Sequence, residues 1–300
     1  MGMRHGIMFH HFHGGGYPVQ QGSVGADELE RMIEEAGKDL VSADKWLTGR
    51  GIICLSFDDM LKSQFEIALP VLRHYKLTAF WFVNTSGLEG NTKLPELYRM
   101  FRCGFSTMEK FYAAFEKEMV AVGIVDGIDN ALREYDEDTY LKDFPFYTAA
   151  DKKFRYLRDM VVKDKYYNIM DAMIESHGFK LEYDSTWMSG SDLNNLAADG
   201  HVIGLHSHNH PTTLGTLPIE NQLEEYRKNV ASLSRTLSCS ETAVKRSMSH
   251  PCNSYTQATL GILCGMRIDM GFRSNMAPVE NRTRWECPRE DCANIKRNWT

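Results

Sequence analysis

The sequence predicts an α/β protein, a distorted barrel of alternating strands and helices with a helical insertion at about residues 95–180. Three observations support this fold class. Short apolar runs alternate with amphipathic helical segments, two of these runs end in polar clusters, and the middle of the chain has helical patterns only. A chain of 300 residues with 43% hydrophobic content can bury one large core, so we expect a single domain over residues 1–300.

The predicted strands are short apolar runs bounded by polar or turn residues, and they lie at residues 7–10, 52–55, 77–83, 202–205 and 283–287. The predicted helices carry apolar residues at helical spacing, and they cover residues 27–36, 62–75 (despite Pro70) and 216–237. Gly37 marks the end of the first of these helices. This alternation of strand and helix is typical of an α/β barrel.

The insertion is predicted from the helical patterns between about residues 95 and 180. Residues 106–109 (Ser-Thr-Met-Glu) form a capping-box pattern before an amphipathic helix, and Gly178 ends another helical segment. No linker-like composition separates this stretch from its neighbours, so we expect an inserted cap within the barrel domain. Its many aromatic residues are candidates for stacking on a ligand, but packing is the more common role of such side chains.

Two polar clusters follow directly after predicted strands. Asp58 and Asp59 come after the strand at 52–55, and His206 and His210 come after a later one. The carboxyl ends of barrel strands are where α/β barrel enzymes carry their active sites. Two neutral imidazoles and one carboxylate hold a divalent metal and leave positions open for water and substrate. Each pair alone has a simpler interpretation, a solvated turn or structural histidines, but together they predict a catalytic metal site.

These clusters resemble two motifs of a known family. Residues 56–59 (Ser-Phe-Asp-Asp) and 206–210 (His-Ser-His-Asn-His) are similar to the first two motifs of the polysaccharide deacetylases, metal-dependent enzymes that remove acetyl groups from amino sugars. Residues 188–204 also resemble the helix and turn that precede the second motif. The resemblance spans roughly residues 5–90 and 186–291, and it implies the distorted (β/α) barrel of that family.

The resemblance implies a role for each polar residue. Asp59, His206 and His210 would bind the metal, and Asp58 would be the general base that takes a proton from water. The metal would lower the pKa of that water and polarise the acetyl carbonyl. Zn²⁺ is expected from the nitrogen and oxygen ligands, with Co²⁺, Ni²⁺ and Fe²⁺ as alternatives of the same geometry.

The third family motif, Arg-x-Pro-Phe/Tyr-Gly, is altered at residues 249–253 (Ser-His-Pro-Cys-Asn). In the family, the arginine steadies the catalytic aspartate, and a backbone N–H after the proline holds the oxyanion. Cys252 still supplies that N–H, because every non-proline residue has one. The missing arginine has a candidate substitute in Arg289, whose fork can hold a carboxylate through charge-assisted hydrogen bonds. The alternative is a surface arginine that pairs with Glu290 or Asp291.

The last family motif carries a histidine that acts as general acid, and no histidine follows His250 in this chain. The strand at 7–10 resembles the opening strand of a family branch in which that motif has moved to the N-terminus. His10 is therefore our candidate for the acid that protonates the leaving amine, with His250 as the alternative. Other N-terminal histidines, which allow an affinity-tag interpretation, alternate with apolar residues as in a strand: His5, His11 and His13.

The predicted function is hydrolytic removal of an acetyl group from an N-acetylated sugar in polysaccharide or glycoconjugate metabolism. One alternative is an O-deacetylase or another C–N hydrolase on the same scaffold, because a fold does not determine its substrate. A second alternative is a non-catalytic sugar-binding relative, which the altered third motif favours and the retained aspartates and histidines oppose.

Composition limits the partners and the compartment. A net charge of −6 without a basic stripe argues against nucleic-acid binding. No apolar run is long enough to span a membrane, and the N-terminus lacks the apolar region of a secretory signal, so we expect a cytoplasmic protein. The seven cysteines are an odd number without metal-site spacing, which fits reduced thiols, and Cys54 is expected to be a buried strand residue. The pattern does not indicate an oligomeric state.

Overall fold

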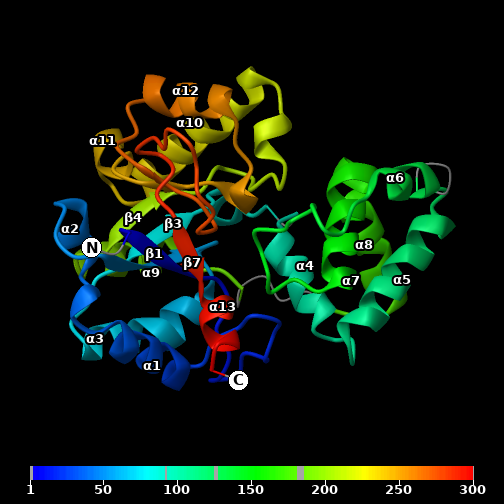
Figure 1. Cartoon of the computed structure of the whole chain (residues 1–300), viewed down its shortest axis with the longest axis horizontal. Coiled ribbons are helices and arrows are strands. Elements are labelled where there is room, and N and C mark those ends of the chain that lie inside the picture. The colour runs from blue at the N-terminus through cyan, green and yellow to red at the C-terminus, as the bar shows by residue number, and fades with distance from the viewer. Residues whose placement is uncertain (1–2, 92, 125–127, 181–185, 300) are drawn as a thin grey trace. The chain divides into compact units, whose positions relative to one another are not determined.

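The computed structural model describes residues 3–91, 93–124, 128–180 and 186–299. The chain forms two compact units, one of Met1–Thr92 together with Asp184–Thr300 and one of Lys93–Tyr183. The first unit contains every strand among the described residues, and the second is built from helices (Figure 1).

Seven parallel strands form the sheet of the first unit among its described residues, in the order β6-β5-β4-β3-β2-β1-β7. They are β1 (His5–Phe9), β2 (Ile53–Asp58), β3 (Phe80–Val83), β4 (Val202–Leu205), β5 (Met248–Ser249), β6 (Gly271–Phe272) and β7 (Arg289–Asp291). The two ends of the sheet approach each other, because Cys287 pairs with Phe272 of β6 and the N–H of Arg289 donates to Asn275 O at 3.3 Å. The sheet is therefore a nearly closed barrel, and the predicted fold class is confirmed.

The helices of this unit lie around the outside of the strands (Figure 1). They are α1 (Ala26–Ala36), α2 (Ala43–Leu47), α3 (Leu69–His74), α9 (Gly190–Ala198), α10 (Ile219–Thr236), α11 (Glu241–Val244), α12 (Gln257–Gly265) and α13 (Cys292–Arg297). Pro70 is accommodated near the start of α3, where a π-helical turn over Gln64–Ala68 precedes it. A wider turn suits this position because proline has no N–H and its ring crowds the carbonyl four residues earlier.

Some predicted boundaries were wrong. The strand predicted at 283–287 is a loop with a single bridge at Cys287, and the strand that closes the barrel is β7. The helix predicted from residue 216 begins at Ile219, after Pro218, because residues 214–216 form a tighter turn. The strand predicted at 77–83 starts only at Phe80. Apolar residues mark burial in each case, but they do not mark where the hydrogen-bonded ladder begins.

The side chains of β2 alternate between two environments. Phe57 stacks on Trp81 with ring centroids 4.3 Å apart, on the face opposite to the interior. Ser56 and Asp58 point the other way, where both accept hydrogen bonds from the buried Arg289. Because alternate side chains of a strand share one face, the polar side chains of β2 point into the barrel. The last of them, Asp58, lies at the C-terminal end of the strand.

The second unit consists of short helices that pack around aromatic and aliphatic side chains. They are α4 (Pro95–Arg102), α5 (Met108–Ala121), α6 (Ile128–Glu134), α7 (Ala149–Tyr156) and α8 (Tyr166–Ser176). Thr107 caps α5 through a bond from Lys110 N, one residue later than the predicted box begins. Phe111, Phe115 and Phe154 belong to a buried core within this unit, so these aromatic side chains pack as expected. The predicted insertion also includes residues 125–127, which lie outside the described residues.

No helix in the described part of the chain has both the length and the apolar composition needed to cross a bilayer.

Candidate metal centre and active site

Asp58 is the last residue of β2 and is held by an arginine from β7, which only β1 separates from β2. Arg289 Nη1 donates to Asp58 Oδ1 and Arg289 Nη2 donates to Asp58 Oδ2, both at 2.7 Å. Burial raises the pKa of the Asp58 carboxyl, but the charges of Arg289 and His206 outweigh it and hold this pKa well below its usual range. Asp58 is therefore an ionised carboxylate in a buried site.

The neighbours of Arg289 explain how a charged side chain fits inside the barrel. Its Nε donates to Arg273 O at 2.6 Å, and its Nη2 donates to Ser249 Oγ at 2.6 Å. Gly6 stands opposite Arg289 on β1, and a Cβ at this glycine would come within 3.2 Å of Arg289 Cγ. The guanidinium is fully buried, and bonded oxygens surround it.

Asp59 turns the chain away from β2. Its φ of 76° lies in the left-handed region, which non-glycine residues rarely adopt. This turn brings the second carboxylate to the same end of the barrel as Asp58, although neighbouring residues of a strand point to opposite faces. Asn84, which follows β3 directly and is buried, donates from Nδ2 to Asp59 Oδ1 at 3.3 Å.

His206 and His210 belong to the loop after β4. Ser207 and His210 have φ values of 59° and 53°, so the loop contains two left-handed residues. His210 N donates to Ser207 Oγ at 3.1 Å, which closes the loop into a tight turn. The predicted loop, rather than a helix, is what the chain adopts here.

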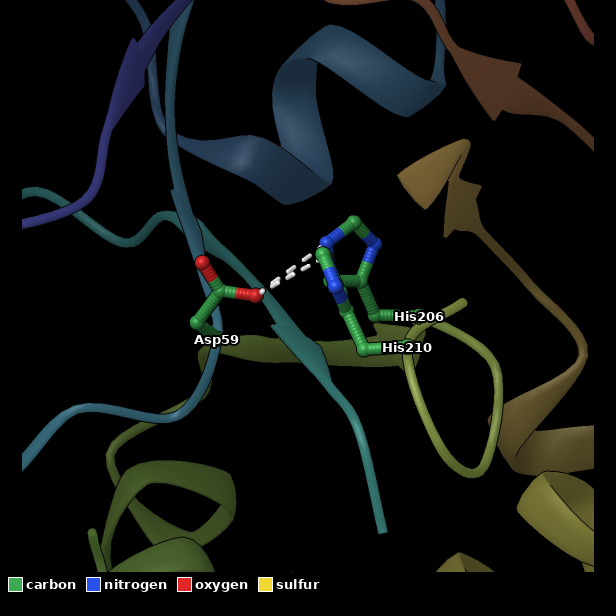
Figure 2. A group of neighbouring side chains, drawn as sticks. All are labelled: Asp59, His206 and His210. Atoms are coloured by element: carbon green, nitrogen blue, oxygen red, sulfur yellow. Dashed lines mark ion pairs between the residues drawn. The ribbon is translucent and has the colours of Figure 1, made fainter. Parts of the chain in front are cut away.

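The two imidazoles converge on one oxygen of Asp59 (Figure 2). His206 Nε2 lies 3.4 Å from Asp59 Oδ1, and His210 Nε2 lies 3.3 Å from the same atom. One ligand atom from each of the three residues lies within 4.8 Å of the others, and all three side chains are buried.

The chemistry of these donors fits a divalent cation. His206 Nδ1 is 2.9 Å from Ser249 O, an acceptor that requires the proton on Nδ1 and leaves the Nε2 lone pair directed toward Asp59. In metal-binding histidines, the ring nitrogen that does not bind the metal commonly donates to a backbone carbonyl, which fixes the tautomer and the orientation of the ring. Burial lowers the pKa of His206, but Asp58 and Asp59 outweigh it and raise this pKa above its ordinary value, so a proton and a cation compete for the site.

His10 directly follows β1 and faces both carboxylates. Its Nε2 lies 3.9 Å from Asp58 Oδ2 and 3.9 Å from Asp59 Oδ2. The side chain keeps 29% of its surface exposed, which leaves it open to a ligand at the barrel mouth. The remaining N-terminal histidines belong to the fold: His5 lies in β1, His11 is buried, and His13 Nδ1 bonds Ser23 Oγ at 2.9 Å.

His250, the alternative candidate for the general acid, is fully buried. Its Nε2 lies 2.9 Å from Trp285 O, and its ring stacks on Tyr255 with centroids 4.3 Å apart. Burial lowers the pKa of His250 to about 4, so the imidazole is neutral near pH 7, and the one N–H it keeps is a very weak acid that donates to Trp285 O. The geometry favours His10 over His250 for that role.

The altered third motif lies at the end of β5, beside Asp58. Ser249, in the place of the family's arginine, donates to Asp58 Oδ2 at 3.1 Å. Pro251 and Cys252 follow in a short turn, in which Cys252 and Asn253 have left-handed φ values of 48° and 57°. Asn253 Oδ1 accepts the N–H of Ser274 at 3.0 Å and so ties the turn to the end of β6.

Three polar residues of the site were missed by reasoning from the sequence. Asn84 touches Asp59, Asn229 accepts the N–H of His206 at 3.0 Å, and Ser249 touches Asp58. Of the three, only Ser249 could be linked to the site from the sequence, because it occupies the arginine position of the third motif. Asn84 could have been flagged as a polar residue directly after an apolar strand, but Asn229 lies inside a long amphipathic helix where nothing distinguishes it.

No protein-family model matches the sequence, and no curated protein matches it. Solved structures do share its fold. The Streptococcus pyogenes deacetylase PplD, in complex with acetate, has a TM-score of 0.56 at 13% identity, and the match covers 98% of this chain and 96% of that one. A de-N-acetylase from Aggregatibacter actinomycetemcomitans has a TM-score of 0.56 at 10% identity, with 98% of each chain covered. The polysaccharide deacetylase BC0361 from Bacillus cereus has a TM-score of 0.50 at 12% identity, with 96% of this chain and 64% of that one covered.

The fold of this chain is therefore that of the polysaccharide deacetylases.

Proposed function

We propose that this chain is a metal-dependent carbohydrate deacetylase, which hydrolyses the acetamido group of an N-acetylated sugar to acetate and an amine. One observation carries the proposal. A three-ligand set of Asp59, His206 and His210 lies beside Asp58, a buried carboxylate that an arginine keeps ionised. The fold shared with a deacetylase and a de-N-acetylase adds support.

The cation would be held by Asp59, His206 and His210. When bound, a divalent cation supplies a Lewis acid that makes water more acidic and an acetyl carbonyl more electrophilic. Zn²⁺ is our first candidate, and Co²⁺, Ni²⁺ and Fe²⁺ suit the same two nitrogens and one oxygen. Ser249 O orients His206 for this task through the bond to Nδ1.

Asp58 would be the general base. It accepts one proton from the attacking water while the water oxygen forms its bond to the acetyl carbon. Arg289 and Ser249 would keep the carboxylate in one orientation, because they donate to its two oxygens from fixed positions on β7 and β5. The aspartate thus approaches the reaction ionised and with little freedom to rotate.

The remaining roles fall to Cys252 and His10. The backbone N–H of Cys252, which follows Pro251 next to the site, would donate to the oxyanion formed by the attack. His10 would give a proton to the nitrogen as the C–N bond breaks, so that the amine leaves neutral and acetate remains. Its Nε2 lies 3.9 Å from Asp58 Oδ2, which supports the proposal that the acid and the base act on the same substrate group.

The altered third motif, residues 249–253, is compatible with catalysis, because its missing arginine is replaced from elsewhere in the chain. The arginine missing at Ser249 has a counterpart in Arg289, which makes the bidentate contact with Asp58 from another strand. A buried ion pair is costly to desolvate, so its retention beside the three-ligand set favours a functional role for Asp58.

The proposed substrate is an acetylated amino sugar of polysaccharide or glycoconjugate metabolism, and the proposed compartment is the cytoplasm. The compartment is supported by the seven cysteines, all of which are free thiols.

The proposal is tested by acetate release from a panel of N-acetylated and O-acetylated sugars, with the protein stripped by chelator and then reloaded with each candidate metal. We expect release from N-acetylated sugars that is lost on stripping and regained on reloading. Release from O-acetylated sugars alone would point to an esterase, and absence of release with every metal and substrate would reject catalysis. Asp58→Asn protein, loaded in the same way, controls for contaminating deacetylases.

A further inference from the structure

Glu225 of helix α10 binds the histidine loop through its carboxylate. Glu225 Oε2 accepts the backbone N–H of His208 at 3.0 Å and that of Asn209 at 2.7 Å. Its other oxygen, Oε1, accepts from Asn209 Nδ2 at 2.7 Å. Three donors from two consecutive residues of the loop therefore converge on one half-buried side chain.

One turn later on the same helix face, Asn229 makes a second set of contacts. Its Oδ1 accepts the N–H of His206 at 3.0 Å, while its Nδ2 donates to Val83 O at 2.9 Å and to Thr85 Oγ1 at 3.1 Å. Asn229 is fully buried, so these bonds are not exchanged with water. Glu225 and Asn229 together attach the loop to α10 and to the end of β3.

The loop needs such attachment because its conformation is not intrinsically favoured. Ser207 and His210 hold left-handed backbone angles, which L-residues adopt at a cost. Only three residues separate His206 from His210, and two of them, His208 and Asn209, are those that Glu225 binds. Release of these two N–H groups would free the segment that sets the spacing between the imidazoles.

We propose that Glu225 is a positioning residue of the metal site, which fixes the His206–His210 loop so that both Nε2 atoms face Asp59 before a cation arrives. This inference rests on the proposed function, because it assigns Glu225 to the metal site of that function. The effect comes from hydrogen bonds to the loop and not from the negative charge of Glu225 at a distance. Support that orients metal ligands typically contributes about 10- to 100-fold in metal affinity.

The neighbouring Glu224 provides a matched control. It lies on the same helix and carries the same charge, but its side chain is exposed and pairs with Lys228 at 2.7 Å. Glu225→Gln keeps an oxygen for the two backbone N–H groups but turns an amide toward Asn209 Nδ2. A flip of Asn209 cannot restore that bond cheaply, because Asn209 Oδ1 accepts from Asn91 Nδ2 at 3.3 Å.

The experiment measures the affinity of the stripped protein for Zn²⁺ and Co²⁺ by competition with a chromophoric chelator. We expect Glu225→Ala to bind about 10- to 100-fold more weakly than wild type, Glu225→Gln about fivefold more weakly, and Glu224→Ala as wild type does. Thermal unfolding of the same metal-free samples checks that the variants are folded; if Glu225→Ala is not, the comparison of Glu225→Gln with Glu224→Gln decides.

Two results would overturn the inference. Glu225→Ala with wild-type affinity would mean that the loop holds its shape without the helix. Equal losses in Glu225→Ala and Glu225→Gln would mean that charge and not hydrogen bonding acts. A wild-type protein that binds neither metal would reject the proposed function, whereas a metal-binding wild type with an unaffected Glu225→Ala variant rejects this inference alone.

Discussion

Arg289 on β7 donates one hydrogen bond of 2.7 Å to each carboxylate oxygen of Asp58 on β2, two strands away in the barrel. The two residues are 231 positions apart in the chain, and both are buried. This pair replaces the arginine of the third family motif, whose position Ser249 occupies. The barrel therefore keeps an arginine on Asp58, the proposed general base, while supplying it from a different strand.

Arg289→Lys should impair turnover although it keeps the positive charge. Lysine has no planar fork, so it cannot bind both oxygens of Asp58 at once. We expect turnover to fall by roughly 10²-fold, as for a misplaced catalytic group. The acid limb of the pH–rate profile should move to higher pH, because the pKa of Asp58 rises when the pair weakens.

The control is Arg235→Lys, at an exposed arginine that pairs with Glu89 at 3.1 Å. It should leave turnover and pH profile unchanged. An Arg289→Lys enzyme with the wild-type rate and profile would remove Arg289 from the active site.

His10→Ala should affect an amide far more than an activated acetate ester. The amine leaving group needs a proton and a nitrophenolate does not, so loss of a general acid should cost roughly 10²–10⁴-fold on the amide only. His13→Ala removes a nearby histidine that bonds Ser23, and it should leave the ratio of the two rates unchanged. Equal losses on both substrates in His10→Ala would exclude His10 as the acid.

Metal affinity should fall as the pH falls. Asp58 and Asp59 raise the pKa of His206. A protonated imidazole cannot bind a cation, so the metal must displace this proton when the pH is below that pKa. Each proton displaced should lower the metal affinity by up to about tenfold per pH unit. Competition with a chelator between pH 8 and pH 6 measures this slope, and proton release on loading measures the same coupling independently. A flat affinity over this range would contradict it.

His201 should make folding stability depend on pH away from the active site. Burial lowers the pKa of His201 to about 4, and its Nδ1 accepts the N–H of Ala79 at 3.0 Å. The unfolded chain takes up this proton near pH 6.5 and the folded chain does not, so stability is present above pH 6.5 and is lost as the pH falls toward 4. The loss is up to about 1.4 kcal/mol per pH unit for one histidine.

His201→Asn keeps an acceptor for Ala79 without titrating. Urea unfolding at pH 6.5 and pH 4.5 should show a shallower loss of stability in this variant than in wild type, whereas His74→Asn, at an exposed histidine, should follow wild type. Identical pH dependence of wild type and His201→Asn would show that His201 is not buried in its neutral form.

The parts of this architecture that follow from local pattern could be predicted from the sequence. Apolar runs mark β2 and β4, and the polar residues after them lie at the carboxyl edge, as parallel strands require. The convergence of the two aspartates could not be derived from strand geometry, because it depends on the left-handed turn at Asp59. The contacts of Asn229 and Glu225 were also inaccessible, since a helix sequence does not reveal which loop packs against it.

The closing strand is the clearest error of interpretation. Residues 283–287 were predicted as a strand, and residues 289–291 were not. The structure has the strand, β7, at residues 289–291, and it includes the buried Arg289. Arg289 was already the candidate arginine for Asp58, but three consecutive charged residues, Arg289–Asp291, give no apolar pattern that would mark a buried strand. Gly6, which makes room for the arginine, precedes the strand predicted at 7–10, so the sequence did not indicate this role.

The central claim is a division of labour between two adjacent carboxylates, with Asp59 binding the metal and Asp58 acting as the base. The measurement that tests it most directly is metal content and acetate release on the same dialysed samples of wild type, Asp58→Asn and Asp59→Ala. Asp58→Asn should retain the metal and lose roughly 10²–10⁴-fold in rate, and Asp59→Ala should lose both. An Asp58→Asn protein that keeps its metal and near-normal activity, or an Asp59→Ala protein with full metal occupancy, would contradict the account.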